Sequence, residues 1–170
     1  MSTTRILLEC EAAVLPTTAP ATLTKVESSG AAPTNGIKVD YNKLVFLNGA
    51  NKGANWNFRL PSDYVSGGSV FIKWYADATT GKVAWMGGIA PIIDSTTNVT
   101  SVSYNAADLA TAVTVPGTSG LVLETSWALT VTNLAAGRFC SLFIGRQGTN
   151  ASDTSANNAN IIAAEFEYTS

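Results

Sequence analysis

The sequence predicts an all-β protein: a single β-sandwich, with a jelly-roll of about eight strands as the leading topology. Apolar and polar residues alternate with a period of two in several short segments. Glycine, proline and asparagine stand between these segments, where the chain must reverse. Only residues 106–112 are weakly helical in pattern. An immunoglobulin-like sandwich is the alternative, because alternation alone does not reveal strand order.

The alternation is clearest between Trp56 and Gly88, where three short strands each carry a tryptophan. Within the first two strands every second residue is apolar, which is typical of a sheet with one buried face. These apolar positions are Trp56, Phe58, Leu60, Val70, Ile72 and Trp74. The expected strands of the globular part cover residues 43–47, 55–60, 69–76, 82–89, 111–115, 121–130, 138–146 and 160–168.

Residues 1–36 are expected to form an extended N-terminal arm, and residues 37–170 the sandwich domain. Residues 5–14 read as one strand or extended segment, and a short strand is expected near residues 23–26. The arm could add a strand to a neighbouring subunit or stay in its own subunit as an extra edge strand. The residues assigned to this assembly role are Arg5, Ile6, Leu7, Leu8, Val14 and Leu15.

The charge content of the chain limits the classes of partner that we expect it to bind. Charged residues make up 13% of the chain, against about 25% in a typical soluble domain. With a net charge of -2 and scattered basic residues, no nucleic-acid partner is expected. No apolar run is long enough for a membrane helix, so no membrane partner is expected either. Glu9 and Glu11 interrupt a potential secretion signal, which favours synthesis in a host cytoplasm.

Few residues offer catalytic chemistry. The chain has no histidine, which excludes serine–histidine and cysteine–histidine catalysis and imidazole metal sites. No phosphate-binding glycine loop is present. We therefore expect no catalytic residue, no cofactor, no metal and no small-molecule substrate. The polar loop that contains Asn150, Ser152, Asp153 and Asn157 could bind calcium through its side-chain oxygens. A solvated loop without a metal is the favoured interpretation.

A glycan hydrolase built on paired carboxylates is a further alternative. Glu124, Glu165 and Glu167 are the acidic residues within the expected strands. Glu165 and Glu167 lie two residues apart, hence on one strand face, and are expected to be solvated. Cys10 and Cys140 are expected to be buried free thiols rather than a disulfide.

Exposed aromatic side chains could instead bind sugars. We expect the tryptophans to pack in the core, because they are in phase with other apolar residues. Tyr75 and Tyr64 are the aromatic residues expected at a surface.

One segment resembles a known group of proteins. It runs Trp56-Asn-Phe-Arg-Leu-Pro61, then Tyr64, then Gly68 before Val70-Phe-Ile-Lys-Trp-Tyr75, and finally Gly81-Lys-Val-Ala-Trp85. In this pattern the chain resembles capsid decoration (cement) proteins and head-fibre domains of tailed bacteriophages. The match covers residues 44–88. Its core and turn positions are Trp56, Phe58, Leu60, Pro61, Gly68, Trp74 and Trp85.

The resemblance implies a structural virion protein rather than an enzyme. It implies a jelly-roll that assembles, commonly as a homotrimer, on the outer surface of the capsid. There it would clamp neighbouring subunits of the major capsid protein. The alternative function is a carbohydrate- or receptor-binding β-sandwich module of a phage fibre.

Overall fold

The computed structural model describes residues 2–30 and 39–170. Within these ranges the chain forms twelve strands and one short 3-10 helix, η1. In chain order the elements are β1 (Thr3–Leu8), η1 (Cys10–Ala12), β2 (Thr22–Glu27), β3 (Asp40–Phe46), β4 (Asn51–Arg59), β5 (Ser66–Ala76), β6 (Lys82–Val83), β7 (Trp85–Ile92), β8 (Asp108–Leu109), β9 (Val113–Thr114), β10 (Leu123–Ala128), β11 (Phe139–Gln147) and β12 (Ala159–Thr169). No helix among these residues is long and apolar enough to cross a membrane.

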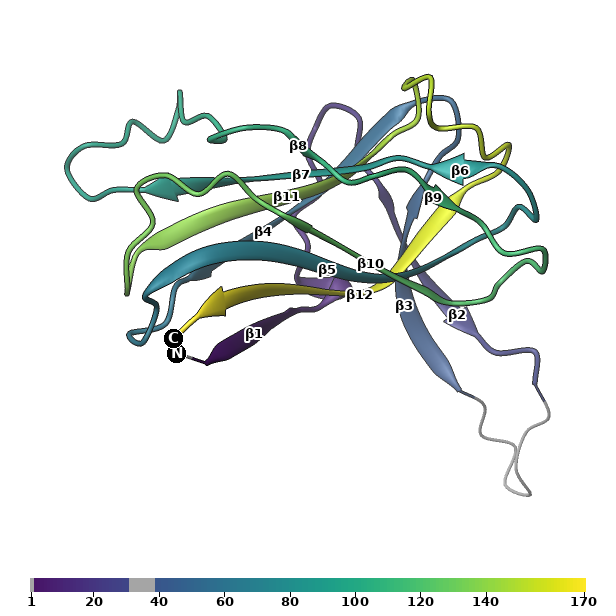
Figure 1. Cartoon of the computed structure of the whole chain (residues 1–170), viewed down its shortest axis with the longest axis horizontal. Coiled ribbons are helices and arrows are strands. Elements are labelled where there is room, and N and C mark those ends of the chain that lie inside the picture. Colours follow the sequence, from purple (N-terminus) through teal and green to yellow (C-terminus); the bar gives the residue numbers. More distant parts are fainter. Residues whose placement is uncertain (1, 31–38) are drawn as a thin grey trace.

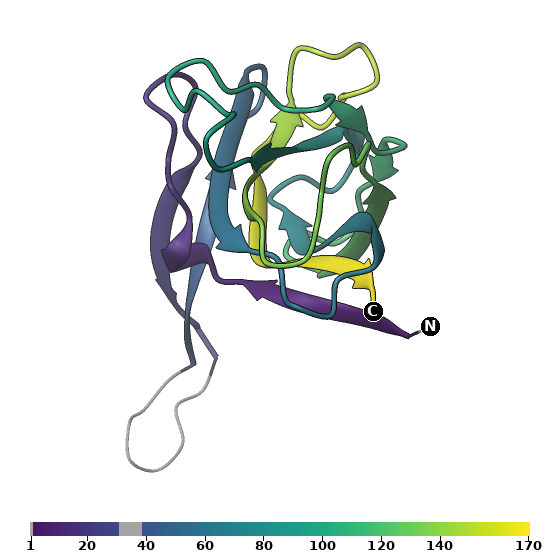
Figure 2. The same cartoon turned by 90° about the vertical axis from the view of Figure 1, so that its left-hand side faces the viewer.

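The strands form two antiparallel sheets that face each other (Figures 1 and 2). The larger sheet has the order β10-β5-β12-β3-β2, and β1 also pairs with β12. The smaller sheet has the order β4-β11-β7-β8, and β6 pairs with β9 in a separate ribbon. Both orders bring together strands that are far apart in the chain. If only the strands from β3 to β12 are considered, and the β6–β9 ribbon is left out, the two strand orders are those of a jelly-roll. The predicted sandwich and jelly-roll are therefore confirmed, and the immunoglobulin-like alternative is wrong.

The core lies between the two sheets and is built around tryptophans. Trp56, Trp74 and Trp85 are buried, and the rings of Trp74 and Trp85 meet edge to face at 5.3 Å between centroids. Such a geometry places the positive edge of one ring on the negative face of the other. The indole nitrogen of Trp74 donates to Thr125 Oγ1 at 2.8 Å.

The other positions of the family pattern also lie at core or turn sites. Leu60 is buried, and the half-buried Phe58 packs on Phe166 with 5.5 Å between ring centroids. Pro61 lies two residues after the end of β4, and its carbonyl accepts from the Tyr64 amide. Gly68 leaves no room for a side chain, since a Cβ there would lie 2.7 Å from Val131 Cγ1.

The N-terminal segment lies on the sandwich of its own chain. β1 pairs antiparallel with β12, from Thr3 opposite Thr169 to Leu8 opposite Ala164. The expected single strand over residues 5–14 is wrong beyond Leu8, because the chain turns into η1 and buries the Cys10 side chain. β2 matches the short strand expected near residues 23–26. The expected domain boundary after residue 36 lies outside the described residues.

The weakly helical segment 106–112 is extended instead. It contains β8, which pairs with β7 in the smaller sheet. The Asp108 carboxylate accepts the backbone amide of Thr130 at 2.5 Å and its hydroxyl at 2.7 Å. These long-range bonds outweigh the weak helical propensity of an alanine-rich segment. Likewise the expected strand 82–89 divides into β6 and β7, and the expected strand 111–115 shortens to β9.

Candidate functional site

A groove runs across the face of the larger sheet that is turned away from the smaller sheet. It exists because β1 and β3 share one edge of β12. β3 pairs with β12 as far as Ile161, and β1 begins to pair only at Ala164. Ile162 and Ala163 therefore have no partner strand on this edge, and the two neighbouring strands diverge around them. Two adjoining hollows result, and Tyr41 and Ile162 line both. We call them the polar end and the tyrosine end of the outer groove.

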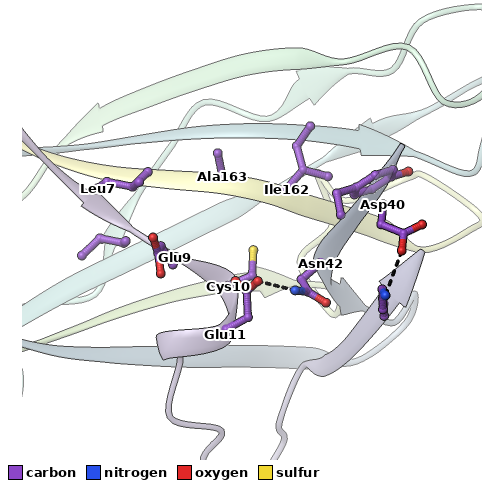
Figure 3. A pocket seen from close by; sticks show the side chains of 11 residues that line it. Leu7, Glu9, Cys10, Glu11, Asp40, Asn42, Ile162 and Ala163 are labelled. Atoms are coloured by element: carbon purple, nitrogen blue, oxygen red, sulfur yellow. Dashed lines mark hydrogen bonds and ion pairs between the residues drawn. The ribbon is translucent and has the colours of Figure 1, made fainter. Parts of the chain in front are cut away.

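The polar end has a volume of about 370 Å³ (Figure 3). Its charged and amide side chains come from η1, the flanking residue Glu9, and strands β2 and β3. They are Glu9, Glu11, Lys25, Asp40 and Asn42. Asn42 Nδ2 donates to Glu11 Oε1, and Lys25 Nζ lies 2.8 Å from Asp40 Oδ2. Three carboxylates against one ammonium make this end acidic and rich in hydrogen-bond acceptors.

The tyrosine end has a volume of about 390 Å³ and is lined by Tyr41, Tyr75, Gly120, Val122 and Ile162. Both tyrosine rings are partly exposed. Lys43 Nζ donates to the Tyr75 hydroxyl at 2.9 Å and lies 5.3 Å from the centre of its ring. A side-chain hydrogen bond with Tyr75 is the main cause that raises the pKa of Tyr41. These contacts hold the two rings in place before any ligand arrives.

Sequence reasoning found only part of this groove. Tyr75 lies in it, as expected of a surface aromatic, whereas Tyr64 is 8% exposed and packs on Tyr168, so that expectation was wrong. Tyr41 was missed. It stands on the outward face of β3, in phase with Lys43 and out of phase with the buried Leu44. That alternation is the signal that could have found it.

The carboxylates considered for glycan hydrolysis do not form a cleft. Arg5 binds both Glu165 and Glu167, with its Nη1 at 2.8 Å and its Nε at 2.9 Å from their Oε2 atoms. Glu124 pairs with Lys73 at 3.4 Å. A hollow lined by Glu124 and Glu165 has a volume of about 10 Å³. That space holds a water molecule at most, and no sugar ring fits there.

The loop considered for calcium is organised by an arginine. The side chains of Arg146 and Asp153 are fully buried, and the Asp153 oxygens lie 2.6 Å and 2.9 Å from Arg146 Nη2 and Nε. Asp153 Oδ2 also accepts the Ala84 amide at 3.0 Å. Among the described residues no group of three acidic or cysteine side chains is placed to hold a metal ion. The Asp153 carboxylate therefore serves as the partner of Arg146 and of the Ala84 amide.

The two cysteines and the arm residues have plain positions. Cys10 and Cys140 are free and buried, which confirms the expectation, and burial raises the pKa of each thiol to about 11. Ile6 and Leu8 face the core, while Leu7 is 59% exposed. The remaining arm residues lie at the surface: Arg5 on the sheet face, Val14 and Leu15 beside β4.

A second aromatic hollow lies on the opposite side of the molecule, over the smaller sheet. Its volume is about 270 Å³, and the rings of Tyr104 and Phe143 form its wall with 4.9 Å between centroids. Met86 and Pro16 complete a mostly apolar lining. This hollow lacks the acidic side chains that the outer groove presents.

Comparison with known proteins bears on the fold. No family model matches the chain, and no curated protein matches it. Among solved structures, a family 35 carbohydrate-binding module from Clostridium thermocellum is similar, with a TM-score of 0.50, 15% sequence identity, and coverage of 96% of this chain and 97% of that one. The similarity shows the fold alone. This chain and that module share a β-sandwich architecture.

A second solved structure agrees. It contains the CBM22-1 and GH10 modules of endo-1,4-β-D-xylanase 10B from Clostridium thermocellum, complexed with xylohexaose. The TM-score is 0.51 and the identity is 14%, over 96% of this chain. The chain spans only 27% of that longer protein.

Proposed function

We propose that this protein is a non-catalytic carbohydrate-binding module that holds a glycan in the outer groove. The observation that carries the proposal is the pair of partly exposed tyrosine rings, Tyr41 and Tyr75, held in place at one end of an acceptor-rich groove. The sandwich architecture, which resembles that of carbohydrate-binding modules, supports it. Of the functions considered from the sequence, this was the alternative to capsid clamping.

The two ends of the groove suit the two chemistries of a sugar. A pyranose ring has a face of C–H groups, which stacks favourably on the electron-rich face of a tyrosine. Its hydroxyl groups donate hydrogen bonds that carboxylates accept strongly. Tyr41 and Tyr75 would take the C–H face, and Glu9, Glu11 and Asp40 would take the hydroxyls. Because the tyrosines are already tethered, little side-chain entropy is lost on binding.

The proposal does not include turnover. A glycosidase needs two carboxyl groups across the scissile bond, one of which acts as an acid. Glu165, Glu167 and Glu124 are each paired with a cation at the sheet surface. In the groove, Glu11 accepts from Asn42 and Asp40 pairs with Lys25. In each pairing the carboxylate acts as a hydrogen-bond acceptor or an ion-pair partner.

The resemblance to virion proteins supplies a setting in which weak glycan binding is useful. Many copies on the outer surface of one phage particle would bind a glycan-coated surface with high avidity, even if each groove binds weakly. Attachment to the major capsid protein and the homotrimer stay predictions. The measurement that tests them is the copy number of this protein on intact particles relative to the coat protein.

Binding to a panel of immobilised oligosaccharides tests the glycan proposal. We expect the protein to bind at least one glycan class, and Tyr75→Ala to weaken that binding by roughly tenfold or more, through loss of the stacked ring. Tyr41→Ala should act in the same direction. Tyr75→Phe keeps the ring but loses the hydroxyl that Lys43 binds, so it should weaken binding less.

Tyr104→Ala is the matched control, because Tyr104 is an exposed aromatic in the other hollow. It should leave binding unchanged. Loss of binding in Tyr104→Ala but not in Tyr75→Ala would move the site to the smaller sheet. Absence of binding across the whole panel, with the parent protein folded by circular dichroism, would refute the proposal.

A further inference from the structure

A third hollow lies on the smaller sheet, where β4 and β7 end and β11 begins. Its volume is about 260 Å³, and two arginine side chains, Arg59 and Arg138, line it. Figure 1 shows the end of β7 beside the start of β11. The hollow that Tyr104 and Phe143 wall lies toward the other end of β4, at residues 51–55. We call the new one the arginine hollow.

The register of the smaller sheet places an aromatic ring in this hollow. Phe139, the first residue of β11, stands opposite Arg59 of β4 on one side and opposite Ile92 of β7 on the other. Residues directly opposite each other in antiparallel strands share one face of the sheet. The next residue, Cys140, is buried in the core, so the row of three points outward. The Phe139 side chain is accordingly 41% exposed.

Two turns form the rims of the arginine hollow, and hydrogen bonds hold both. Before β11, the Gly137 amide donates to the Leu60 carbonyl at 2.9 Å, and the Leu60 amide donates to the Arg138 carbonyl at 2.8 Å. After β7, the Ile93 amide donates to Thr97 Oγ1 at 2.8 Å. The backbone around the hollow is therefore fixed before any ligand arrives, which lowers the entropy cost of binding.

The charges of this hollow are not neutralised by ion pairs. Elsewhere four cationic side chains each pair with a carboxylate of the chain. Within residues 2–30 and 39–170, neither Arg59 nor Arg138 forms such a pair. Arg138 Nη1 donates to the Asn133 carbonyl, which tethers the guanidinium and leaves its other N–H groups available. Asp94 also lines the hollow, so two positive charges stand against one negative charge.

We propose that the arginine hollow binds a small ligand that carries an oxyanion, a carboxylate or a phosphate, on a flat apolar ring. Arg59 and Arg138 bind the oxyanion, because the planar guanidinium matches its oxygen atoms with paired N–H donors. The ring of the ligand lies on Phe139 beside Ile92. Small-molecule sites commonly measure about 300–1,000 Å³, so this slightly smaller hollow suits a single ring.

The charge of the ligand directs it to this hollow rather than to the outer groove. The polar end of the outer groove carries three carboxylates against one ammonium, and it repels an anion. The arginine hollow has the opposite balance and attracts one. The two sites lie on different sheets, and the second does not depend on the glycan proposal.

Titration of the protein with benzoate and with phenyl phosphate, followed by NMR without any glycan, tests the proposal. We expect at least one of the two to bind, and the tighter one identifies the preferred oxyanion. Benzyl alcohol has the ring without the charge, and inorganic phosphate has the charge without the ring. Each should bind roughly tenfold more weakly or less than that. Added salt should weaken the binding of the ring anion.

Three substitutions in the hollow separate its contributions. Arg59→Gln should weaken binding of the ring anion roughly tenfold, and Arg59→Lys should weaken it less, because lysine keeps the charge but loses the planar fork. Asp94→Asn should strengthen binding roughly two- to fivefold, because it removes a repelling charge. Phe139→Ala should weaken binding of the ring anion without changing that of inorganic phosphate.

Arg5→Gln is the matched control, because Arg5 is an exposed arginine on the larger sheet, and it should leave binding unchanged. Thermal unfolding shows that the variants are folded. The proposal is overturned if neither anion binds more tightly than benzyl alcohol, or if Arg59→Gln and Arg5→Gln weaken binding equally. Arg59→Gln should bind glycans as the parent does, so a failure here is distinct from a failure of the glycan proposal.

Discussion

Two clusters of arginine and carboxylate lie in this protein, and they differ in burial. The side chains of Arg146 and Asp153 are fully buried, and the arginine also donates to the carbonyls of Ser155 and Asn157 at 3.0 Å and 2.7 Å. Arg5 binds two glutamates on the sheet surface, where its side chain is 40% exposed. Bond lengths in the two clusters are similar. Burial, rather than distance, decides what each contributes, because water screens the surface charges and is absent around the buried ones.

The Arg146–Asp153 cluster holds a loop in place, whereas the Arg5 cluster lies on the surface of strands β1 and β12. Residues 148–158 contain no strand or helix, yet Arg146 and Asp153 tie them to Ala84, between β6 and β7, and to Phe46 in β3. Gly81 belongs to the same arrangement: its φ is +93°, and a Cβ there would lie 2.5 Å from the Thr154 carbonyl oxygen. The surface cluster closes no loop.

Asp153→Ala should give the largest effect. It leaves the Arg146 guanidinium buried without a counter-charge, which costs about 3–5 kcal/mol of the free energy of unfolding. Equilibrium denaturation in guanidinium chloride measures the loss. Arg146→Met together with Asp153→Leu removes both charges and should recover much of the stability. If Asp153→Ala costs no more than an exposed substitution, the buried pair does not stabilise the loop as described.

The buried thiols of Cys10 and Cys140 should have an intermediate effect on the free energy of unfolding, and this effect should depend on pH. Burial raises the pKa of Cys10 and Cys140 from 9.0 to about 11, so the folded state disfavours the thiolate. Their contribution is fully present below pH about 9 and is lost as the pH rises to about 11. The free energy of unfolding should therefore fall over that range.

A double variant, Cys10→Ala with Cys140→Ala, separates the thiols from the tyrosines, which also titrate at high pH. Its cavities lower stability at every pH, whereas the slope between pH about 9 and about 11 should become shallower than in the parent. Equal slopes in the two proteins would show that the thiols do not ionise with unfolding.

Arg5→Ala should give the smallest effect on stability. The lost ion pairs are solvent-screened, and the remaining glutamates are exposed enough to stay hydrated. The melting temperature should hardly change at low salt or at high salt. A large, salt-dependent fall would mean that this cluster is as important to the fold as the buried one.

Deleting residues 1–16 would not test the assembly role of the N-terminal arm by itself. The deletion removes β1 and the core side chains of Leu8 and Cys10, so it should destabilise the sandwich as well as any assembly. Point changes at Leu7 separate the two effects, because this side chain faces solvent.

The sequence by itself determined the fold class and much of the core. Alternation along β4 and β5 identified the buried faces of Trp56, Ile72 and Trp74, since a strand turns successive side chains to opposite sides wherever it pairs. Turn residues placed most strand ends within a few positions. The absence of histidine excluded imidazole catalysis and imidazole metal sites, because no arrangement of the chain can supply a side chain that it does not contain.

Only the tertiary structure decided the rest, because it depends on which distant segments meet. The outer groove exists since β1 and β3 share one edge of β12, and its lining comes from segments around residues 9, 41, 75, 120 and 162. The partnership of Arg146 with Asp153 and the extended form of residues 106–112 also follow from long-range contacts. Local periodicity reports which face of a strand is buried, whereas pairing partners are chosen by packing across the whole chain.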